Sequence, residues 1–114
     1  MEIVFNIKMY HGTDLKNLIG ISRNGFKEDT ISCASINKEV AGCYGDLIFA
    51  FECPFKIRVN FKTLHVDLIY LRTFIYDYYY KNLISCISGL KPKNLTYEHI
   101  PNRREKYYHK LNTT

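Results

Sequence analysis

The sequence has no tryptophan, no C-x-x-C pair and no long run of apolar residues. Without about 20 consecutive apolar residues, we expect no membrane-spanning helix and no membrane partner. The first ten residues, MEIVFNIKMY, lack an apolar stretch behind a basic start, which argues against a secretory signal peptide. The four cysteines have no zinc-ligand spacing, so we expect no metal site, and free thiols in an intracellular, cytoplasmic setting, a host cytoplasm included.

What the sequence does contain is typical of a folded domain. Hydrophobic residues make up 46% and charged residues 24% of 114 residues, which predicts one domain over residues 1–114. Ten tyrosines and seven phenylalanines supply flat side chains that can fill a core or stack on a ring. The net charge of +5 favours anionic partners such as nucleotides, nucleic acid or acidic proteins.

The hydrophobic pattern predicts a small α+β domain. Asp14 begins one predicted helix, which ends at Asn24-Gly25, and Asn37 begins a second, short one. A third helix is favoured over residues 64–88, although the aromatic content there also suits a strand. Strands are expected over residues 3–10 with a possible break at Asn6, 30–35, 46–54 closed by Pro54, 56–61, and 94–100.

Five pieces of the sequence occur in a suggestive order. They are YHGT at residues 10–13, LIGISRNGFK at 18–27, ISCASINKEVAGCYG at 31–45, DLIFAFECP at 46–54 and YEHIP at 97–101. In this order they resemble the ADP-ribosyltransferase superfamily, in particular its poly(ADP-ribose)-polymerase-like branch with an H-G-[ST] strand end. Residues 55–93 do not contribute to the resemblance. It implies a split β-sheet core with short helices, and NAD as a co-substrate.

The resemblance implies that residues 10–13 hold the nicotinamide end of NAD. Gly12, which has no side chain, would let a carboxamide pair with the backbone N–H and C=O. His11 would hydrogen-bond a ribose hydroxyl through one ring nitrogen, which gives it a catalytic as well as a binding role. Tyr10 and Thr13 complete this binding segment.

Further binding residues are implied by the middle of the sequence. Tyr44 would stack on the nicotinamide ring, although the spacing leaves Cys43 as an alternative. The segment ISCAS is similar to the serine-containing strand of the toxin-like branch, so Ser32 and Ser35 are both candidates for shaping the pocket. Counting back from Glu39 favours Ser35 slightly.

Glu98 is the implied catalytic carboxylate. Breaking the bond from nicotinamide to ribose passes through an oxocarbenium-like state, which a nearby carboxylate stabilises. Glu52 is a rival, but it lies before Pro54, where the resembled family has no catalytic group. Thr96 occupies the position two residues before Glu98, so the E-x-E arrangement of arginine-specific enzymes is absent.

These features favour a mono-ADP-ribosyltransferase that releases nicotinamide and modifies a protein or nucleic-acid acceptor. The short chain and its many Asn, Lys, Ile and Tyr residues suggest a stand-alone effector or toxin of a virus or mobile element. One alternative is an enzyme like the RNA 2′-phosphotransferases, which share an H-G strand end. Another is a non-catalytic basic module or inhibitor that binds nucleic acid or protein through interleaved tyrosines and cations. The oligomeric state is left open.

Overall fold

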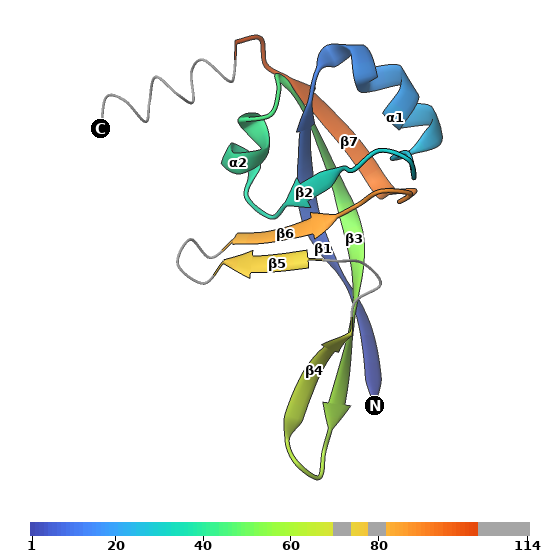
Figure 1. The fold of residues 1–114 in the computed structure, drawn as a ribbon, viewed down its shortest axis with the longest axis vertical. Helices are drawn as coiled ribbons and strands as arrows, with labels where there is room; N and C mark the ends of the chain where they lie inside the picture. Colours follow the sequence, from blue (N-terminus) through green and yellow to red (C-terminus); the bar gives the residue numbers. More distant parts are fainter. Residues whose placement is uncertain (70–73, 78–81, 103–114) are drawn as a thin grey trace, which may run out of the picture.

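The computed structural model describes residues 1–69, 74–77 and 82–102 (Figure 1). Within these residues the fold is mostly β with few short helices, which agrees with the broad α+β expectation. The elements in chain order are β1 (Glu2–Thr13), the 3-10 helix η1 (Leu15–Asn17), α1 (Leu18–Asn24), β2 (Cys33–Ser35), α2 (Lys38–Gly42), β3 (Leu47–Asn60), β4 (His65–Ile69), β5 (Phe74–Asp77), β6 (Asn82–Cys86) and β7 (Lys93–His99).

The strands form one antiparallel sheet in the order β4-β3-β1-β2-β6-β5, and β7 also pairs with β3. The contact between β1 and β2 is narrow, since the register contains only the pair Tyr10↔Ser35. This single pair joins a group made of β4, β3, β1 and β7 to a group made of β2, β6 and β5. Figure 1 shows the second group crossing beside the long β1 and β3 strands.

The paired strands β1 and β3, which we call the β1–β3 ribbon, are the longest elements of the fold. Their register runs without interruption from Glu2↔Arg58 to Thr13↔Leu47. The predicted break at Asn6 is therefore wrong. The N-terminal amine donates to the Val59 carbonyl at 3.0 Å, and the Val59 amide donates to the Met1 carbonyl at 2.8 Å. Hydrogen-bonded pairs alternate along an antiparallel ladder. The backbone N–H and C=O groups of odd-numbered residues of β1 therefore bond to β3, and those of even-numbered residues point away from β3.

Strand β3 continues through Pro54, so the prediction that this residue closes the strand is also wrong. On the outer edge of β3, β7 pairs with Leu47–Glu52 and β4 pairs with Lys56–Asn60. The same alternation turns the nitrogen of Pro54 toward this outer edge, in the gap between the two partners. Proline lacks an N–H to donate, and it is tolerated in a strand where no ladder bond is required.

The hydrophobic core lies between one face of the ribbon and the strands β2 and β6. Alternate residues of β1 and β3 point to this face, as expected for strands. They include Met9, Phe49 and Phe51, each with 1% or less of its surface exposed. The cluster is completed by Phe26, Ala34, Leu47, Cys53, Phe55, Leu83, Ile87 and Leu90.

The two predicted helices are present, and the end of α1 and the start of α2 follow the expected chemistry. Gly25, with φ of 72°, ends α1 in a backbone conformation that glycine adopts at little cost. The Asn37 side chain accepts a hydrogen bond from the Glu39 amide at 2.9 Å and so caps α2. Asp14 precedes the 3-10 turn η1, but its side chain makes no capping bond.

The helix favoured over residues 64–88 is wrong. The described parts of this segment form β4, β5 and β6, and residues 70–73 and 78–81 lie outside the described part of the chain. Strand β6 pairs with β2 on one side and with β5 on the other. The β-branched and aromatic residues of β4, β5 and β6 therefore belong to a sheet. The spacing of the apolar residues alone had suggested one face of a helix. The strand expected near residues 94–100 is confirmed as β7.

Candidate functional site

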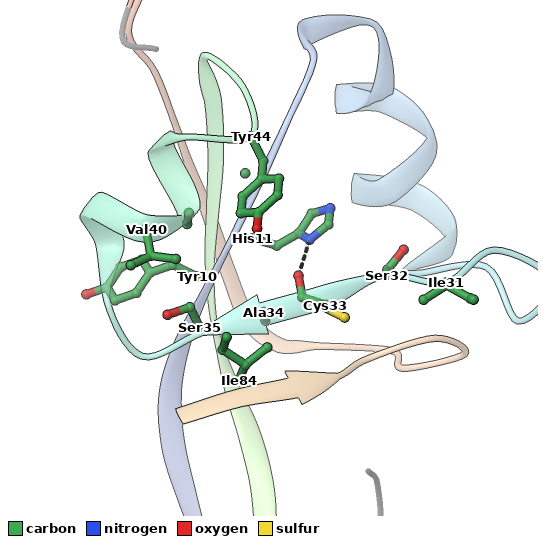
Figure 2. Close-up of a pocket in the computed structure, with 12 residues that line it drawn as sticks. Tyr10, His11, Ile31, Ser32, Cys33, Ala34, Ser35, Val40, Tyr44 and Ile84 are labelled. Atoms are coloured by element: carbon green, nitrogen blue, oxygen red, sulfur yellow. Dashed lines mark hydrogen bonds between the residues drawn. The ribbon is translucent and has the colours of Figure 1, made fainter. Parts of the chain in front are cut away.

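A cavity of about 300 Å³ lies where the C-terminal half of β1 meets β2 and α2 (Figure 2). We call it the β1–α2 pocket. It contains six of the residues singled out from the sequence: Tyr10, His11, Gly12, Ser32, Ser35 and Tyr44. The remaining lining residues are Ile31, Cys33, Ala34, Val40, Ala41 and Ile84.

Two glycines allow α2 to approach β1 and form this pocket. A β-carbon on Gly12 would lie 1.7 Å from the carbonyl oxygen of Ala41, and one on Gly45 would lie 2.1 Å from that of Thr13. Real β-carbons do not approach an oxygen this closely. Sequence reasoning assigned Gly12 to ligand approach. The structure adds a structural requirement, because the helix itself occupies the space that a side chain would need.

The His11 ring is held in one orientation by its neighbours. Its Nδ1 lies 2.7 Å from the Cys33 carbonyl oxygen, which can only accept a hydrogen bond, so Nδ1 carries the proton (Figure 2). The ring also meets Phe26 edge-on, with 5.0 Å between centroids. Burial lowers the pKa of His11 and outweighs the opposite effect of the hydrogen bond. In the neutral ring, Nε2 therefore has a lone pair with which to accept a ligand hydroxyl.

A buried polar pair supports the other side of the pocket. The Ser35 hydroxyl donates to Oδ1 of Asn82 at 2.6 Å and accepts from the Asn37 amide at 2.9 Å. Ser35 and Asn82 are both buried. Their hydrogen bond ties β2 to β6, and the bond from Asn37 ties β2 to the start of α2. Sequence reasoning missed Asn82, although an asparagine at the start of the apolar strand NLISC is a visible signal of a buried polar contact.

Ser32 and Ser35 thus differ in what their side chains do. The hydroxyl of Ser35 already has partners on both sides. Ser32 lines the pocket, and its backbone amide donates to the Ser88 hydroxyl at 3.1 Å. Ser35 therefore has a structural role in the pocket wall. Both serines line the pocket, so both stay candidates for contact with a ligand.

Tyr44 follows α2 directly and stands at the mouth of the pocket, beside His11 in Figure 2. With 67% of its surface exposed, its ring has a face that a ligand could cover. Cys43, the alternative from sequence spacing, is not among the lining residues, and its thiol donates to the Glu39 carbonyl at 3.5 Å. Between the two candidates, the structure therefore favours Tyr44.

A second cavity, of about 540 Å³, adjoins the first, and we call it the lysine hollow. The two cavities share His11, Gly12 and Tyr44, together with Ile31 and Ser32. Thr13 lines the lysine hollow, and its hydroxyl accepts a hydrogen bond from the side-chain Nδ2 of Asn17 at 2.8 Å. Lys16 and Lys27 give the hollow positive charge, whereas the described residues that line the two cavities include no carboxylate.

Glu98 lies in a different place from His11. On β7 it is opposite Ile48, which is in turn opposite Gly12. Its carboxylate contacts the Lys38 ammonium group in a third cavity of about 230 Å³, which we call the Glu98 hollow. Tyr10 lines both this hollow and the β1–α2 pocket, so the two are neighbours. The structure does not bring Glu98 into the pocket with the other predicted residues. Glu52, the rival carboxylate, is opposite Lys8.

Comparison with known proteins gives no assignment: no family model, curated protein or solved structure matches the chain. Among the described residues, none of the helices has the length and apolar character needed to cross a membrane. The same residues contain no cluster of three or more His, Cys, Asp or Glu side chains suited to a metal ion.

Proposed function

We propose that the protein binds NAD, with the nicotinamide and its ribose in the β1–α2 pocket of an ADP-ribosyltransferase-like split sheet. One observation carries the proposal. The resemblance assigned binding roles to residues in two of its five pieces, 10–13 and 31–45, and six of those residues line one cavity. Residues that are up to 34 positions apart, from Tyr10 to Tyr44, share this cavity although the resemblance concerned sequence order alone.

The chemistry of the two adjoining cavities suits the two parts of the ligand. The exposed Tyr44 ring offers a stacking surface for nicotinamide, and Nε2 of neutral His11 can accept a ribose hydroxyl. The pyrophosphate would then extend into the lysine hollow, where Lys16 and Lys27 supply positive charge. This arrangement supports NAD binding more strongly than it supports NAD cleavage.

Mono-ADP-ribosyl transfer to a protein or nucleic acid is the second candidate function. In this reaction the bond from nicotinamide to ribose breaks, nicotinamide leaves, and an acceptor nucleophile bonds to the ribose carbon. A carboxylate near the ribose would stabilise the electron-poor intermediate state. Glu98 is in the adjacent hollow, with Tyr10 between the two cavities, and this neighbourhood favours the candidate. For the reaction, Glu98 would have to exchange its contact with Lys38 for one with the ribose.

Calorimetric titration with NAD tests the binding proposal. Tyr44→Ala should weaken binding by roughly tenfold or more, since base or ring stacking on an aromatic side chain contributes about 1–3 kcal/mol. Tyr97→Ala is the matched control, because Tyr97 is also an exposed tyrosine, and it lines the Glu98 hollow rather than the β1–α2 pocket or the lysine hollow. Absence of both binding heat and an NAD-dependent thermal shift in the wild-type protein would rule out the proposal.

Labelled NAD with a cell lysate separates binding from transfer. Transfer of label by the wild-type protein, lost in Glu98→Gln, would establish the transferase and show its acceptor by size. NAD binding without nicotinamide release would instead establish a non-catalytic NAD-binding protein. Salt-sensitive RNA binding by a protein that does not bind NAD would favour the basic nucleic-acid module.

A further inference from the structure

Among the described residues, the N-terminal half of β1 has an open edge. In the part of the chain that the structure describes, β1 pairs with β3 along one side, whereas its other side meets β2 only at Tyr10. Figure 1 shows this half of β1 extending beside β3 and away from the helices. The outward N–H and C=O groups belong to the even-numbered residues Glu2, Val4, Asn6 and Lys8, because the Met1–Val59 pair bonds inward.

This edge lacks the devices that keep natural edges from pairing. Exposed edges are commonly protected by proline, by a bulge or by several charges. Residues 2–8 contain no proline, their register with β3 has no bulge, and the only charges are at the two ends. Ile3, Val4 and Phe5 are 38%, 62% and 37% exposed, so the apolar side chains beside the edge are also incompletely covered.

From these features we propose that two copies of the chain associate through antiparallel pairing of this edge, with a twofold axis at Phe5. In this register Glu2 is opposite Lys8 of the second copy, and Val4 is opposite Asn6. These are the residues whose backbone groups point outward, so each pair exchanges two hydrogen bonds. Ile3 is opposite Ile7 of the second copy, and Phe5 is opposite Phe5 of the second copy. The inference does not depend on NAD binding.

The positions of charged residues favour this register over registers with the twofold axis one residue away. Within one chain Glu2 is opposite Arg58, and Lys8 is opposite Glu52. Glu2 also forms an ion pair with Arg58 at 3.0 Å. The proposed register therefore makes a row across four strands with alternating sign: Arg58, Glu2, then Lys8 and Glu52 of the second copy. Shifting the axis to Val4 or Asn6 places Glu2 or Lys8 opposite an uncharged residue.

Aromatic contact supports the same axis on the other face of the sheet. The rings of Phe5 and Phe55 stack with 6.1 Å between centroids and 26° between planes. Pairing at Phe5 extends this stack into a row of four rings, two from each copy. The central pair does not exchange backbone hydrogen bonds, and side chains lie closest at such positions. An interface limited to one strand edge is small, so we expect micromolar affinity.

Sedimentation velocity of the full chain over roughly 5 to 500 µM measures the association directly. We expect a monomer–dimer equilibrium for the wild-type protein and for Val4→Thr, which keeps the backbone amide. Val4→Pro removes one outward N–H but no bond to β3, and it should weaken the dimer by roughly tenfold or more. A wild-type protein that stays monomeric throughout, or a dimer unaffected by Val4→Pro, would overturn the proposal.

Exchange of charges provides a test that does not depend on proline. Glu2→Lys places a lysine opposite Lys8 of the second copy, and Lys8→Glu places a glutamate opposite Glu2. Each variant alone should dimerise less than wild type, and circular dichroism checks that each is folded. An equimolar mixture should recover association, because both opposed pairs then have opposite charge. Failure of the mixture to recover association contradicts the register.

Deletion of residues 103–114 distinguishes a second copy from the chain's own C-terminal segment. Under the proposal the truncated and full chains dimerise alike. A full chain that is monomeric and dimerises only after truncation would show that the edge is occupied by its own chain, and the proposal would fail.

Discussion

The two halves of the β1–β3 ribbon have similar sequence patterns and different surroundings. In the site half, Met9–Thr13 pairs with Leu47–Phe51 and is flanked by β2, α2 and β7. In the arm half, Glu2–Ile7 pairs with Cys53–Arg58, and the described strands add only β4, along the far side of β3. Both halves contain apolar residues on each of their two strands, yet Phe49 is completely buried and Phe5 is 37% exposed.

This comparison shows that the elements packed against a strand decide whether it encloses a pocket or stays at an edge. Gly12 and Gly45 let a helix and a turn approach the site half closely enough to enclose a pocket. The arm half has no glycine between Glu2 and Ile7, and none of the helices that the structure describes lies against it. Among the described residues, the ribbon therefore lines a pocket at one end and has an open edge at the other.

Replacing one phenylalanine in each half by alanine should give the largest difference in the free energy of unfolding. Phe49→Ala removes a completely buried ring from the site half and should lower the free energy of unfolding by about 3–5 kcal/mol. Phe5→Ala, in the arm half, should cost about 1 kcal/mol because the ring is partly exposed. Urea denaturation at low micromolar concentration measures both. Equal losses would show that the two halves are packed alike.

Glycine substitution tests whether close approach is specific to the site half. Gly12→Ala introduces a β-carbon that collides with the Ala41 carbonyl, so it should destabilise the fold by about 1–3 kcal/mol and weaken NAD binding. Gly20→Ala is the control for stability, because a β-carbon there meets nothing within 4 Å. In the helix α1 it should stabilise the protein by about 0.4–1 kcal/mol. A neutral Gly12→Ala would contradict the close packing of α2 on β1.

The acid sensitivity of His11 is expected to be a smaller effect, again confined to the site half. Burial lowers the pKa of His11 below its ordinary value of 6.5, so the unfolded chain binds a proton more readily than the folded one. Stability is therefore complete above pH 6.5 and falls as the pH drops from there toward the lowered pKa. Unfolding free energies at about pH 7.5 and about pH 5.5 should differ more for wild type than for His11→Gln. A larger loss in the variant would show the opposite sign.

A cross-link between Cys33 and Cys86 tests the position of β2 behind the site half. The two residues are opposite each other on β2 and β6. The Ile87 amide donates to the Ser32 carbonyl, and the Ile36 amide donates to the Leu83 carbonyl. Because hydrogen-bonded pairs alternate along the ladder, the two cysteines form a pair without backbone hydrogen bonds between them, where side chains are closest. Burial, with the nearby Cys86, raises the pKa of the Cys33 thiol, so exchange with oxidised glutathione should accelerate at alkaline pH.

Peptide mapping under non-reducing conditions would detect that disulfide, and Cys86→Ser is the control. A disulfide that joins Cys33 to Cys43 or Cys53 instead would contradict the β2–β6 register. The bond would form within one chain, so it should leave the proposed edge-to-edge association unchanged.

Local signals predicted the first half of the fold well. Gly25 and Asn37 have chemistry that acts within a few residues, and both helix ends lie where that chemistry placed them. The prediction that Pro54 closes a strand was wrong because the effect of a proline depends on which edge of the strand its nitrogen faces. That edge follows from the pairing of β3 rather than from the local sequence. The segment 64–88 misled because apolar residues at helical spacing can equally complete a sheet once β2 is available as a partner.

The candidate site was predictable to a similar extent. Residues from Tyr10 to Tyr44 come from segments that are close in the chain, and the pocket brings six of them together. The position of Glu98 depends on the register of β7 against β3, which residue spacing does not contain. Asn82 contacts Ser35 across 47 positions of sequence, so its role in the pocket wall became visible only with the fold.

The register of the β1–β3 ribbon also bears on how the chain acquires its shape during synthesis. Thr13 and Leu47 are the paired residues closest in sequence, and Glu2 and Arg58 are the most distant. Closing a shorter loop costs less entropy, so pairing should begin at the Thr13 end and proceed toward the N-terminus. On the ribosome, β1 emerges well before its partner strand. In this order the end of β1 that contains His11 pairs first, and Glu2 pairs last.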